Sequence, residues 1–351
     1  MKVLYLFNKV LAKTVEDAEN GKGHDSWLFG MLRLRKYGIT TDFLEIEKYI
    51  PAKLGRLLRA HILTMHYAHI PLFPLFFRYD VVFTSTAYGC MVLKALFRIR
   101  RFKWVVLDFN ILGTIQEEKT LREKIFAWAL SKVDGIVAIS KIEADALKKR
   151  FPHLSDRIVF LHEATDIDFF KPDQTIPQRN MIISVGNYGR DFDTLIEAVR
   201  GLPVEVCLAT KLISVEKLQV LPSNVTARLY NHEDMLRLYC EAKIAFIGIE
   251  KKDTYFDSVG TLALGEALAM GKATIATHMK SMESYIEHGV TGFFVPYKDV
   301  VALRLQIETL LQDDALRTSV GNKAYTFARK ALDPEKFAQG VAEFMKNTVM
   351  K

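Results

Sequence analysis

Residues 257–296 read DSVGTLALGEALAMGKATIATHMKSMESYIEHGVTGFFVP, and the predicted fold is built outward from them. A loop without bulky side chains ends at Gly260 and leads directly into a predicted helix over 261–270. The first amides of a helix have no intrahelical acceptor and lie at the positive end of its dipole, so they form an anion site, usually for phosphate. We therefore predict a phosphate loop at Gly260, Thr261 and Leu262. The rest of the stretch predicts, in order, Gly271 after the helix, a buried strand at 273–277, a short helix at 281–287 and a turn at Gly289.

One carboxylate, that of Glu266, lies six residues into this predicted helix. Positions about a turn and a half apart stay near one face, so the side chain faces back toward a ligand held at the N-terminus. A phosphate loop with an acid behind it suits a nucleotide, whose ribose hydroxyls the acid reaches. The stretch is therefore interpreted as a nucleotide-binding site.

The segment EALAMGKATIAT, which begins at Glu266, resembles the donor site of the family-4 retaining glycosyltransferases (glycosyl transferases group 1), which have the GT-B fold. In that family a Glu, seven residues and a second Glu precede an Ala-Met-Ala-x-Gly-x-Pro-Val-Ile-Ala sequence. Glu266 stands at the second Glu, whereas the first falls on Ser258, with Asp257 one residue before it. The resemblance implies contact between Glu266 and the ribose and between position 258 and the sugar, and Ser258 departs from the pattern there.

The run HEATDIDFFKPD, at 162–173, resembles the family's crossover Pro-Asn-Gly-Val-Asp-x-x-x-Phe-x-Pro, with Glu163 and Ala164 where Asn and Gly are usual. The resemblance implies an α/β protein of two facing Rossmann-like domains with parallel sheets. The expected parts are an N-terminal acceptor-binding domain at 1–172, a nucleotide-sugar-binding domain at 173–332, and a C-terminal helix at 333–351 that crosses back to the first domain.

Strand and helix signals alternate along the chain, which is typical of parallel sheets with ligands at the carboxyl ends of the strands. The predicted strands are 2–7, 41–47, 79–85, 103–109, 135–139 and 157–163, then 181–185, 204–209, 225–230 and 244–249. The other predicted helices are 25–37, one that begins at a capping box of Ser140 and Glu143, 232–242, 300–332 and 334–350.

The loop after the 181–185 strand supplies the donor-binding candidates Gly186, Asn187 and Arg190. Arg190 is the candidate for diphosphate contact, because a guanidinium grips phosphate through two bonds and stays charged. The alternative is a surface ion pair with Asp191 or Asp193. Three further donor-binding candidates follow the next two strands: Lys211, as a second phosphate ligand, and Tyr230 and Asn231, where the resemblance implies base recognition.

Candidates in the first domain follow its strands. The polar stretch after the first strand contains Gly21-Lys22-Gly23-His24, and the resemblance implies that Gly21, Gly23 and His24 line the acceptor cleft. Asp25 belongs either to this group or to the cap of the 25–37 helix. Asp108 and Asn110 lie at the end of the 103–109 strand, where Asp108 either orients an acceptor hydroxyl or serves as a loop or cap residue.

The bulk composition describes a globular protein. The 351 residues, half hydrophobic and a quarter charged, fit two domains. The three cysteines, Cys90, Cys207 and Cys240, lie far apart, which indicates neither a zinc site nor a disulfide framework and favours a reducing cytoplasm. The N-terminus is interpreted as a strand, with no leader, and no transmembrane segment is predicted.

Positive charge is concentrated in the first half. Residues 1–172 hold 27 Lys and Arg against 19 Asp and Glu, a net charge of +8, whereas the remainder carries −1. Two predicted basic helices, 48–63 and 91–103, interleave Lys and Arg with apolar residues, so we interpret them as an attachment to the anionic inner face of a membrane. The alternative is two helices packed on the sheet with their charges in water. No helix-turn-helix, zinc-finger or RNA-binding strand motif is visible, so no nucleic-acid partner is expected.

These observations predict a glycosyltransferase of hexosyltransferase type. It would move a sugar from a UDP- or GDP-sugar to an acceptor hydroxyl of a lipid-linked or cell-envelope glycan, with retention of configuration as the resemblance implies. The expected catalytic group is Asp108, Ser258 and Glu266, and no metal or other cofactor is expected. Two alternatives stay open: a non-catalytic GT-B nucleotide-sugar-binding or partner subunit, and a nucleotide-sugar epimerase. A dehydrogenase is disfavoured because no strand is followed by GxGxxG.

Overall fold

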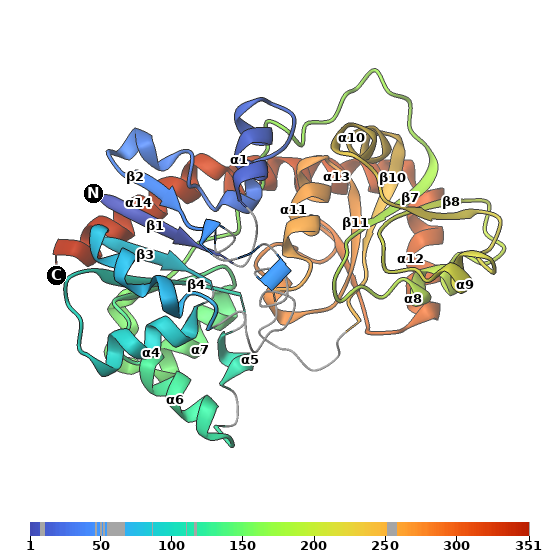
Figure 1. The fold of residues 1–351 in the computed structure, drawn as a ribbon. Helices are drawn as coiled ribbons and strands as arrows, with labels where there is room; N and C mark the ends of the chain where they lie inside the picture. Colours follow the sequence, from blue (N-terminus) through green and yellow to red (C-terminus); the bar gives the residue numbers. More distant parts are fainter. Residues whose placement is uncertain are drawn as a thin grey trace. The chain divides into compact units, whose positions relative to one another are not determined.

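The computed structural model describes residues 1–7, 11–45, 48–49, 51, 53–54, 67–85, 87–109, 111–115, 118–250 and 258–350. Its contacts divide the chain into two compact units, unit 1 with Met1–Leu161 and Glu335–Lys351 and unit 2 with His162–Pro334 (Figure 1). This division lies between residues 161 and 162, whereas the sequence analysis placed it after residue 172.

Unit 1 is built on a six-stranded sheet in the order β2-β1-β3-β4-β5-β6, in which all neighbouring strands are parallel. The strands are β1 (Lys2–Leu6), β2 (Thr40–Phe43), β3 (Val81–Thr84), β4 (Lys103–Asp108), β5 (Gly135–Ala138) and β6 (Ile158–Phe160). Its helices are α1 (Ala12–Glu19), α4 (Tyr88–Leu96), α5 (Ile111–Thr114), α6 (Leu121–Leu130), α7 (Lys141–Arg150) and α14 (Pro334–Met350). The central strands are continuous apolar runs because both faces of the sheet are covered.

Unit 2 repeats this architecture with the order β12-β11-β10-β7-β8-β9, again parallel throughout. The strands are β7 (Arg179–Val185), β8 (Glu205–Ala209), β9 (Val225–Arg228), β10 (Ala242–Ile247), β11 (Ala273–Thr277) and β12 (Phe293–Val295). The helices are α8 (Asp193–Ala198), α9 (Val215–Leu218), α10 (His232–Glu241), α11 (Thr261–Ala269), α12 (Val300–Gln312) and α13 (Asp314–Ala331). One apolar cluster packs α10, α11 and α13 on one face, and a second packs α8 and α12 on the other. The predicted α/β class with two Rossmann-like parallel sheets is confirmed.

The strand order of unit 2 determines where a ligand site is expected. The chain runs outward from β7 through β8 to β9, then returns to the other side of β7 with β10 and continues to β11 and β12. The order therefore reverses between β7 and β10, and crevices at such switch points, outside the carboxyl ends of the strands, hold ligands in open α/β sheets. The loop after β7, the end of β10 and the N-terminus of α11 all belong to this edge.

The predicted helix over 25–37 is wrong. The segment forms two short 3-10 helices, η1 (Ser26–Leu28) and η2 (Leu34–Tyr37), separated by Phe29 and Gly30 with φ angles of 46° and 77°. A Cβ on Gly30 would lie 3.1 Å from Cβ of Ala338, so this backbone approaches α14 from the other end of the chain. A local hydrophobic period carries no information about that contact. The real helix of this region, α1, occupies part of the stretch predicted as a polar loop.

Three other local predictions also differ from the structure. The 281–287 helix is reduced to a 3-10 turn, η6 (Lys280–Met282). α7 begins after Ser140, but the Ser140 side chain makes no cap hydrogen bond, and the unpredicted capping box lies at Thr120 and Glu123 of α6. α4 ends at Leu96, so the basic segment 91–103 is not one helix, and most of the 48–63 segment lies outside the described residues. In the part of the chain that the structure describes, no helix is long and apolar enough to cross a membrane.

Candidate functional site

The loop between β7 and α8 is fastened to the end of β10. The N–H of Asp191 donates to the carbonyl of Gly248 at 3.2 Å, and the N–H of Glu250 donates to the carbonyl of Gly189 at 3.0 Å. A Cβ on Gly248 would lie 2.3 Å from the carbonyl oxygen of Asp191, so the absence of a side chain permits this approach. The two carboxyl ends at the switch point are thus held together before any ligand is present.

Arg190 lies between two glycines of this site. A Cβ on Gly186 would stand 2.1 Å from its Nε, and a Cβ on Gly260 would stand 3.0 Å from its Nη1. Nε donates to the carbonyl of Val185 at 3.0 Å, whereas Nη1 is buried and has no hydrogen-bond partner among the described residues. Burial lowers the pKa of Arg190 to about 10, so the side chain stays charged at neutral pH. This is a cation held in place with hydrogen-bonding capacity left for an anion.

The alternative reading of Arg190 as a surface ion pair is not what the structure shows. The carboxylate of Asp191 accepts from Thr194, in the first turn of α8, at 3.0 Å from its N–H and 2.5 Å from its hydroxyl. Asp193 pairs with Lys217. Both carboxylates therefore have other partners.

Glu266 is buried in α11 and accepts a hydrogen bond from the hydroxyl of Tyr239 at 3.2 Å. Burial raises the pKa of Glu266 to about 7, although the Tyr239 hydrogen bond and the positive charge of Arg190 pull it down. Glu266 in α11 therefore interacts with Tyr239 of α10 through a hydrogen bond and with Arg190 of the β7–α8 loop through their opposite charges. Tyr239 was not predicted as a site residue, because its position on the apolar face of α10 reads as core.

Two predicted donor residues join neighbouring strand ends. Oδ1 of Asn187 accepts from the N–H of Lys211 at 2.8 Å and lies 3.4 Å from the hydroxyl of Thr210, so it ties the loop after β7 to the loop after β8. The backbone of Lys211 is fixed in this way while its side chain is exposed. The position leaves the ammonium group able to reach a ligand at the sheet edge.

Tyr230 and Asn231 lie beyond β9. The hydroxyl of Tyr230 accepts from Sγ of Cys207 at 3.1 Å, and the guanidinium of Arg228 lies 4.6 Å from the centre of the ring. Oδ1 of Asn231 accepts from the N–H of Asp234 at 2.8 Å, which caps α10. The Asn231 side chain therefore has a structural role, and the exposed part of Tyr230 is better placed to meet a base.

The N-terminus of α11 starts at Gly260, whose φ of 98° places it in the left-handed region. The N–H of Thr261 has an acceptor at 3.3 Å in the carbonyl of Ser258, so the next amide, that of Leu262, is better placed for an anion. The hydroxyl of Thr261 lies 2.7 Å from the same carbonyl and 2.5 Å from Oε2 of Glu163. Asp257 lies outside the described residues.

Glu163 is a site residue that the sequence analysis did not select. Its signal was the acid that stands where the resembled crossover has Asn, but its meeting with α11 depends on a contact across 98 residues of chain. The acidic residue in place of Asn could therefore have marked Glu163 as a candidate. The spacing of residues along the sequence does not predict its contact with Thr261.

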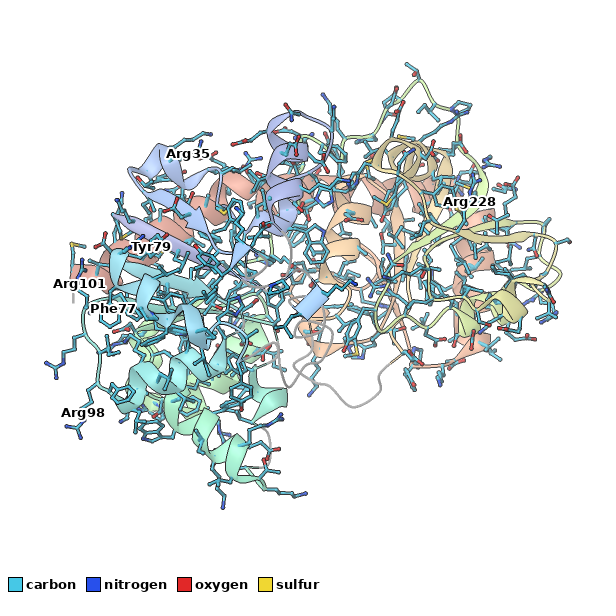
Figure 2. All side chains as sticks on the ribbon, in the orientation of Figure 1. Arg35, Phe77, Tyr79, Arg98, Arg101 and Arg228 are labelled. Atoms are coloured by element: carbon cyan, nitrogen blue, oxygen red, sulfur yellow. The ribbon has the colours of Figure 1, made fainter. Side chains whose placement is uncertain are left out.

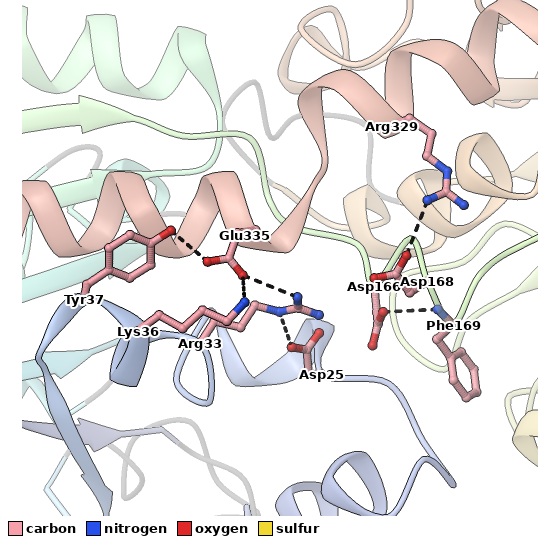
Figure 3. Close-up of polar contacts among 9 residues, drawn as sticks. All are labelled: Asp25, Arg33, Lys36, Tyr37, Asp166, Asp168, Phe169, Arg329 and Glu335. Atoms are coloured by element: carbon pink, nitrogen blue, oxygen red, sulfur yellow. Dashed lines mark hydrogen bonds and ion pairs between the residues drawn. The ribbon is translucent and has the colours of Figure 1, made fainter.

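In unit 1, the glycine loop does not present free amides. The N–H of Gly21 donates to the carbonyl of Ala18 at 3.2 Å, and the N–H of Gly23 donates to that of Asp17 at 3.1 Å, so both glycines terminate α1. His24, the next residue, is buried. Asp25 makes no side-chain cap to η1 and instead accepts from Nε of Arg33 at 2.7 Å, as Figure 3 shows.

Asp108 lies at the carboxyl end of β4 and is fully buried. Its Oδ1 accepts from the N–H of Ile111 at 2.8 Å and so begins α5, which is the cap role considered as an alternative. Burial, together with the negative charges of Asp108 and Glu143, raises the pKa of Tyr88. Asn110 lies outside the described residues. Within those residues, no group of three or more His, Cys, Asp or Glu could hold a metal ion.

Comparison with known proteins agrees with this arrangement. Residues 166–327 match the family model described as Glycosyl transferases group 1, and no curated relative matches the chain by sequence. The structure of Anabaena HepE in complex with UDP is similar, with a TM-score of 0.71 at 16% identity over 99% of this chain and 100% of that chain. Its complex with UDP-glucose gives 0.69 at 16% identity over 99% and 100%. Sucrose-phosphate synthase from Thermosynechococcus elongatus gives 0.71 at 15% identity over 99% of both chains. The chain therefore has the GT-B fold, and the part of unit 2 at residues 166–327 matches the glycosyl transferases group 1 family model.

Proposed function

We propose that this protein transfers a hexosyl group from a UDP-sugar to an acceptor hydroxyl, with retention of anomeric configuration. The observation that carries the proposal is the half-buried Arg190 guanidinium, which lies between Gly186 and Gly260 at the N-terminus of α11 and whose buried Nη1 has no hydrogen-bond partner among the described residues. The group 1 family match supports the reaction class, and the UDP and UDP-glucose complexes of Anabaena HepE support uracil as the base of the donor.

The site's contribution is electrostatic. During transfer the bond between the anomeric carbon and the diphosphate oxygen breaks, and the leaving UDP takes the bonding electrons. The acceptor oxygen bonds to the anomeric carbon, and its proton passes to the leaving diphosphate. Arg190 and the first amides of α11 stabilise the negative charge that develops on the diphosphate. Glu266 accepts hydrogen bonds from the ribose hydroxyls. Burial raises the pKa of its carboxyl to about 7, and these hydrogen bonds favour the ionised carboxylate when the nucleotide binds. Because this cation and dipole supply the positive charge, we propose that transfer needs no bound metal.

Ligand-dependent unfolding and turnover test this proposal together. UDP at about 100 times its dissociation constant should raise the free energy of unfolding by roughly 2.7 kcal/mol, whereas GDP, ADP and CDP should not. The shift should be lost in Glu266→Ala. Release of UDP from a UDP-sugar in the presence of an acceptor, with the product anomer assigned by NMR, should persist in EDTA. UDP binding without turnover on any acceptor would favour a non-catalytic binding subunit, and an epimerised donor without acceptor would favour an epimerase.

We further propose that the acceptor is a lipid-linked glycan met at the cytoplasmic face of an anionic membrane. Three large apolar side chains of unit 1 are exposed near basic residues: Phe77 by 42%, Leu96 by 60% and Phe97 by 67%. The ring of Phe77 lies 5.5 Å from that of Phe102, next to Arg101, and Figure 2 shows Phe77, Arg98 and Arg101 on the same side of unit 1. Lys94, by contrast, is buried in an ion pair with Asp134 at 2.9 Å. Among the residues that the structure describes, the basic groups that support attachment, Arg98 and Arg101, lie in the loop after α4.

Co-sedimentation with vesicles tests the attachment. Binding should require phosphatidylglycerol in phosphatidylcholine vesicles and fall with added salt, because arginines near an anionic surface contribute about 1 kcal/mol each. Arg98→Glu with Arg101→Glu should abolish it, and Leu121→Ser, which removes an exposed apolar side chain from α6, should not. Binding that is equal on neutral vesicles would contradict the proposal.

A further inference from the structure

A buried carboxylate lies at the N-terminal end of α11, and the mechanism above does not use it. Glu163 is 2% exposed, and its Oε2 lies 2.5 Å from the hydroxyl of Thr261, the first residue of the helix. Its N–H donates to the hydroxyl of Tyr285 at 2.8 Å. The side chain is thus held at the start of α11, and the backbone is held by Tyr285, which follows η6.

The chain next to Glu163 is fixed on the same helix. A Cβ on Gly265 would lie 2.1 Å from Oγ1 of Thr165, so this glycine in α11 receives the threonine side chain. The N–H of Thr165 donates to the carbonyl of Leu332 at 2.9 Å. The position of Glu163 is therefore set by packing within unit 2.

The Thr261 hydroxyl stands between two acceptors. Oε2 of Glu163 lies 2.5 Å away and the carbonyl of Ser258 lies 2.7 Å away, and a hydroxyl has one hydrogen to donate. A carboxylate oxygen can accept more than one hydrogen bond, so Oε2 of Glu163 can accept from a ligand hydroxyl beside Thr261. Hydrogen bonds to a carboxylate are stronger than those between neutral groups.

The location matches one part of a nucleotide-sugar. Nη1 of Arg190 approaches Gly260, and Glu163 approaches the adjacent Thr261, so a cation and a carboxylate flank successive residues at the start of α11. In a UDP-sugar the sugar is bonded directly to the diphosphate, so a diphosphate at Arg190 brings the sugar hydroxyls to this end of the helix. The other acceptor of the Thr261 hydroxyl is the backbone carbonyl of Ser258, so the acidic side chain at this hydroxyl is that of Glu163.

We infer that Glu163 accepts hydrogen bonds from hydroxyls of the transferred sugar and thereby determines which sugar the site takes. This inference rests on the proposed function. The competing explanation is structural: a carboxylate near the N-terminus of α11 would stabilise the helix dipole whether or not a sugar binds. The two explanations differ in what the sugar adds to binding.

Calorimetric titration of UDP and of UDP-sugars separates them. The probes are UDP, UDP-glucose, UDP-galactose and UDP-N-acetylglucosamine, with the tightest sugar carried forward. In Glu163→Gln the dissociation constant of UDP should stay within about twofold, while that of the UDP-sugar should rise about 10- to 100-fold, the loss of a charge-assisted hydrogen bond. Glu233→Gln, which removes an exposed carboxylate from α10, should change neither.

A conservative variant provides a readout that helix stabilisation would not move. Glu163→Asp keeps the negative charge near α11 but shortens the side chain by one methylene, so UDP affinity should stay within about twofold while UDP-sugar affinity should fall about tenfold. Equal loss of UDP and UDP-sugar binding in Glu163→Gln, or no loss of either, would overturn the inference. Failure of the unmodified protein to bind UDP would overturn the proposed function itself, which the titration of UDP alone identifies.

Discussion

Replacing Arg190 with alanine is expected to lower kcat/KM for the UDP-sugar by about 100- to 1,000-fold, the size of effect seen when a donor that stabilises transition-state charge is removed. Negative charge on the diphosphate increases as the sugar leaves, so most of the loss should be in kcat. The affinity for UDP should fall less, by about tenfold. The measurement is steady-state kinetics on purified protein, with UDP affinity measured separately by calorimetry.

Two further variants separate charge from geometry at this position. Arg190→Lys retains a positive charge but loses the planar fork, so it should fall between the alanine variant and the unmodified protein. Arg200→Ala, which removes an exposed arginine paired with Glu197 in the same unit, should leave kcat/KM unchanged. If Arg190→Ala keeps kcat within about threefold, Arg190 does not stabilise the leaving group and the proposed role is wrong.

The Arg190→Ala variant should also change the pH dependence of UDP binding. The positive charge of Arg190 now lowers the pKa of Glu266, which stands at about 7. Without that charge the pKa of Glu266 rises, and the carboxylate that accepts from the ribose is present only at higher pH. The pH at which UDP affinity increases should therefore be higher in the variant than in the unmodified protein.

The strands of both sheets were predictable because their signal is local. A strand covered on both faces is a continuous apolar run, as in β3, β4 and β10, and each such run ends in polar or glycine residues. The glycines at 260 and 271 bracket α11 in the same way, so the helix and the following strand were found with nearly their observed bounds. The GT-B fold follows from these two signals and the resemblance.

The parts that were missed depend on contacts between distant residues. The helix predicted over 25–37 is broken because Gly30 meets Ala338 on α14. Arg190 was selected by residue type, but its position between Gly186 and Gly260 joins two loops that are separate in sequence. The pairing of Glu163 with Thr261 is of the same kind. Local sequence patterns predict the helices and strands, whereas the contacts of Arg190 and Glu163 form only where separate segments of the fold meet.

Gly186→Ala is expected to displace Arg190 and to weaken UDP binding about tenfold or more, as Arg190→Ala does. The φ of Gly186 is 146°, a conformation that residues with a Cβ rarely adopt, and the added carbon would lie 2.1 Å from Nε and 2.7 Å from Cζ of Arg190. Backbone strain and overpacking together should lower the free energy of unfolding by about 2–4 kcal/mol. Urea denaturation and UDP titration measure the two effects.

Gly201→Ala is the matched control, because Gly201 also has a positive φ, 76°, but nothing lies within 4 Å of its added Cβ. It should cost about 1 kcal/mol of stability and leave UDP binding unchanged. The double variant Gly186→Ala with Arg190→Ala then tests whether the added Cβ acts through its contact with the Arg190 side chain. If the glycine matters because it leaves space for the guanidinium, Arg190→Ala should cost less UDP affinity in the Gly186→Ala background than it costs in the unmodified protein, a coupling that independent sites do not show. Additive losses would mean that Gly186 acts through the backbone of the loop, and the slot between Gly186 and Gly260 would not be what positions Arg190.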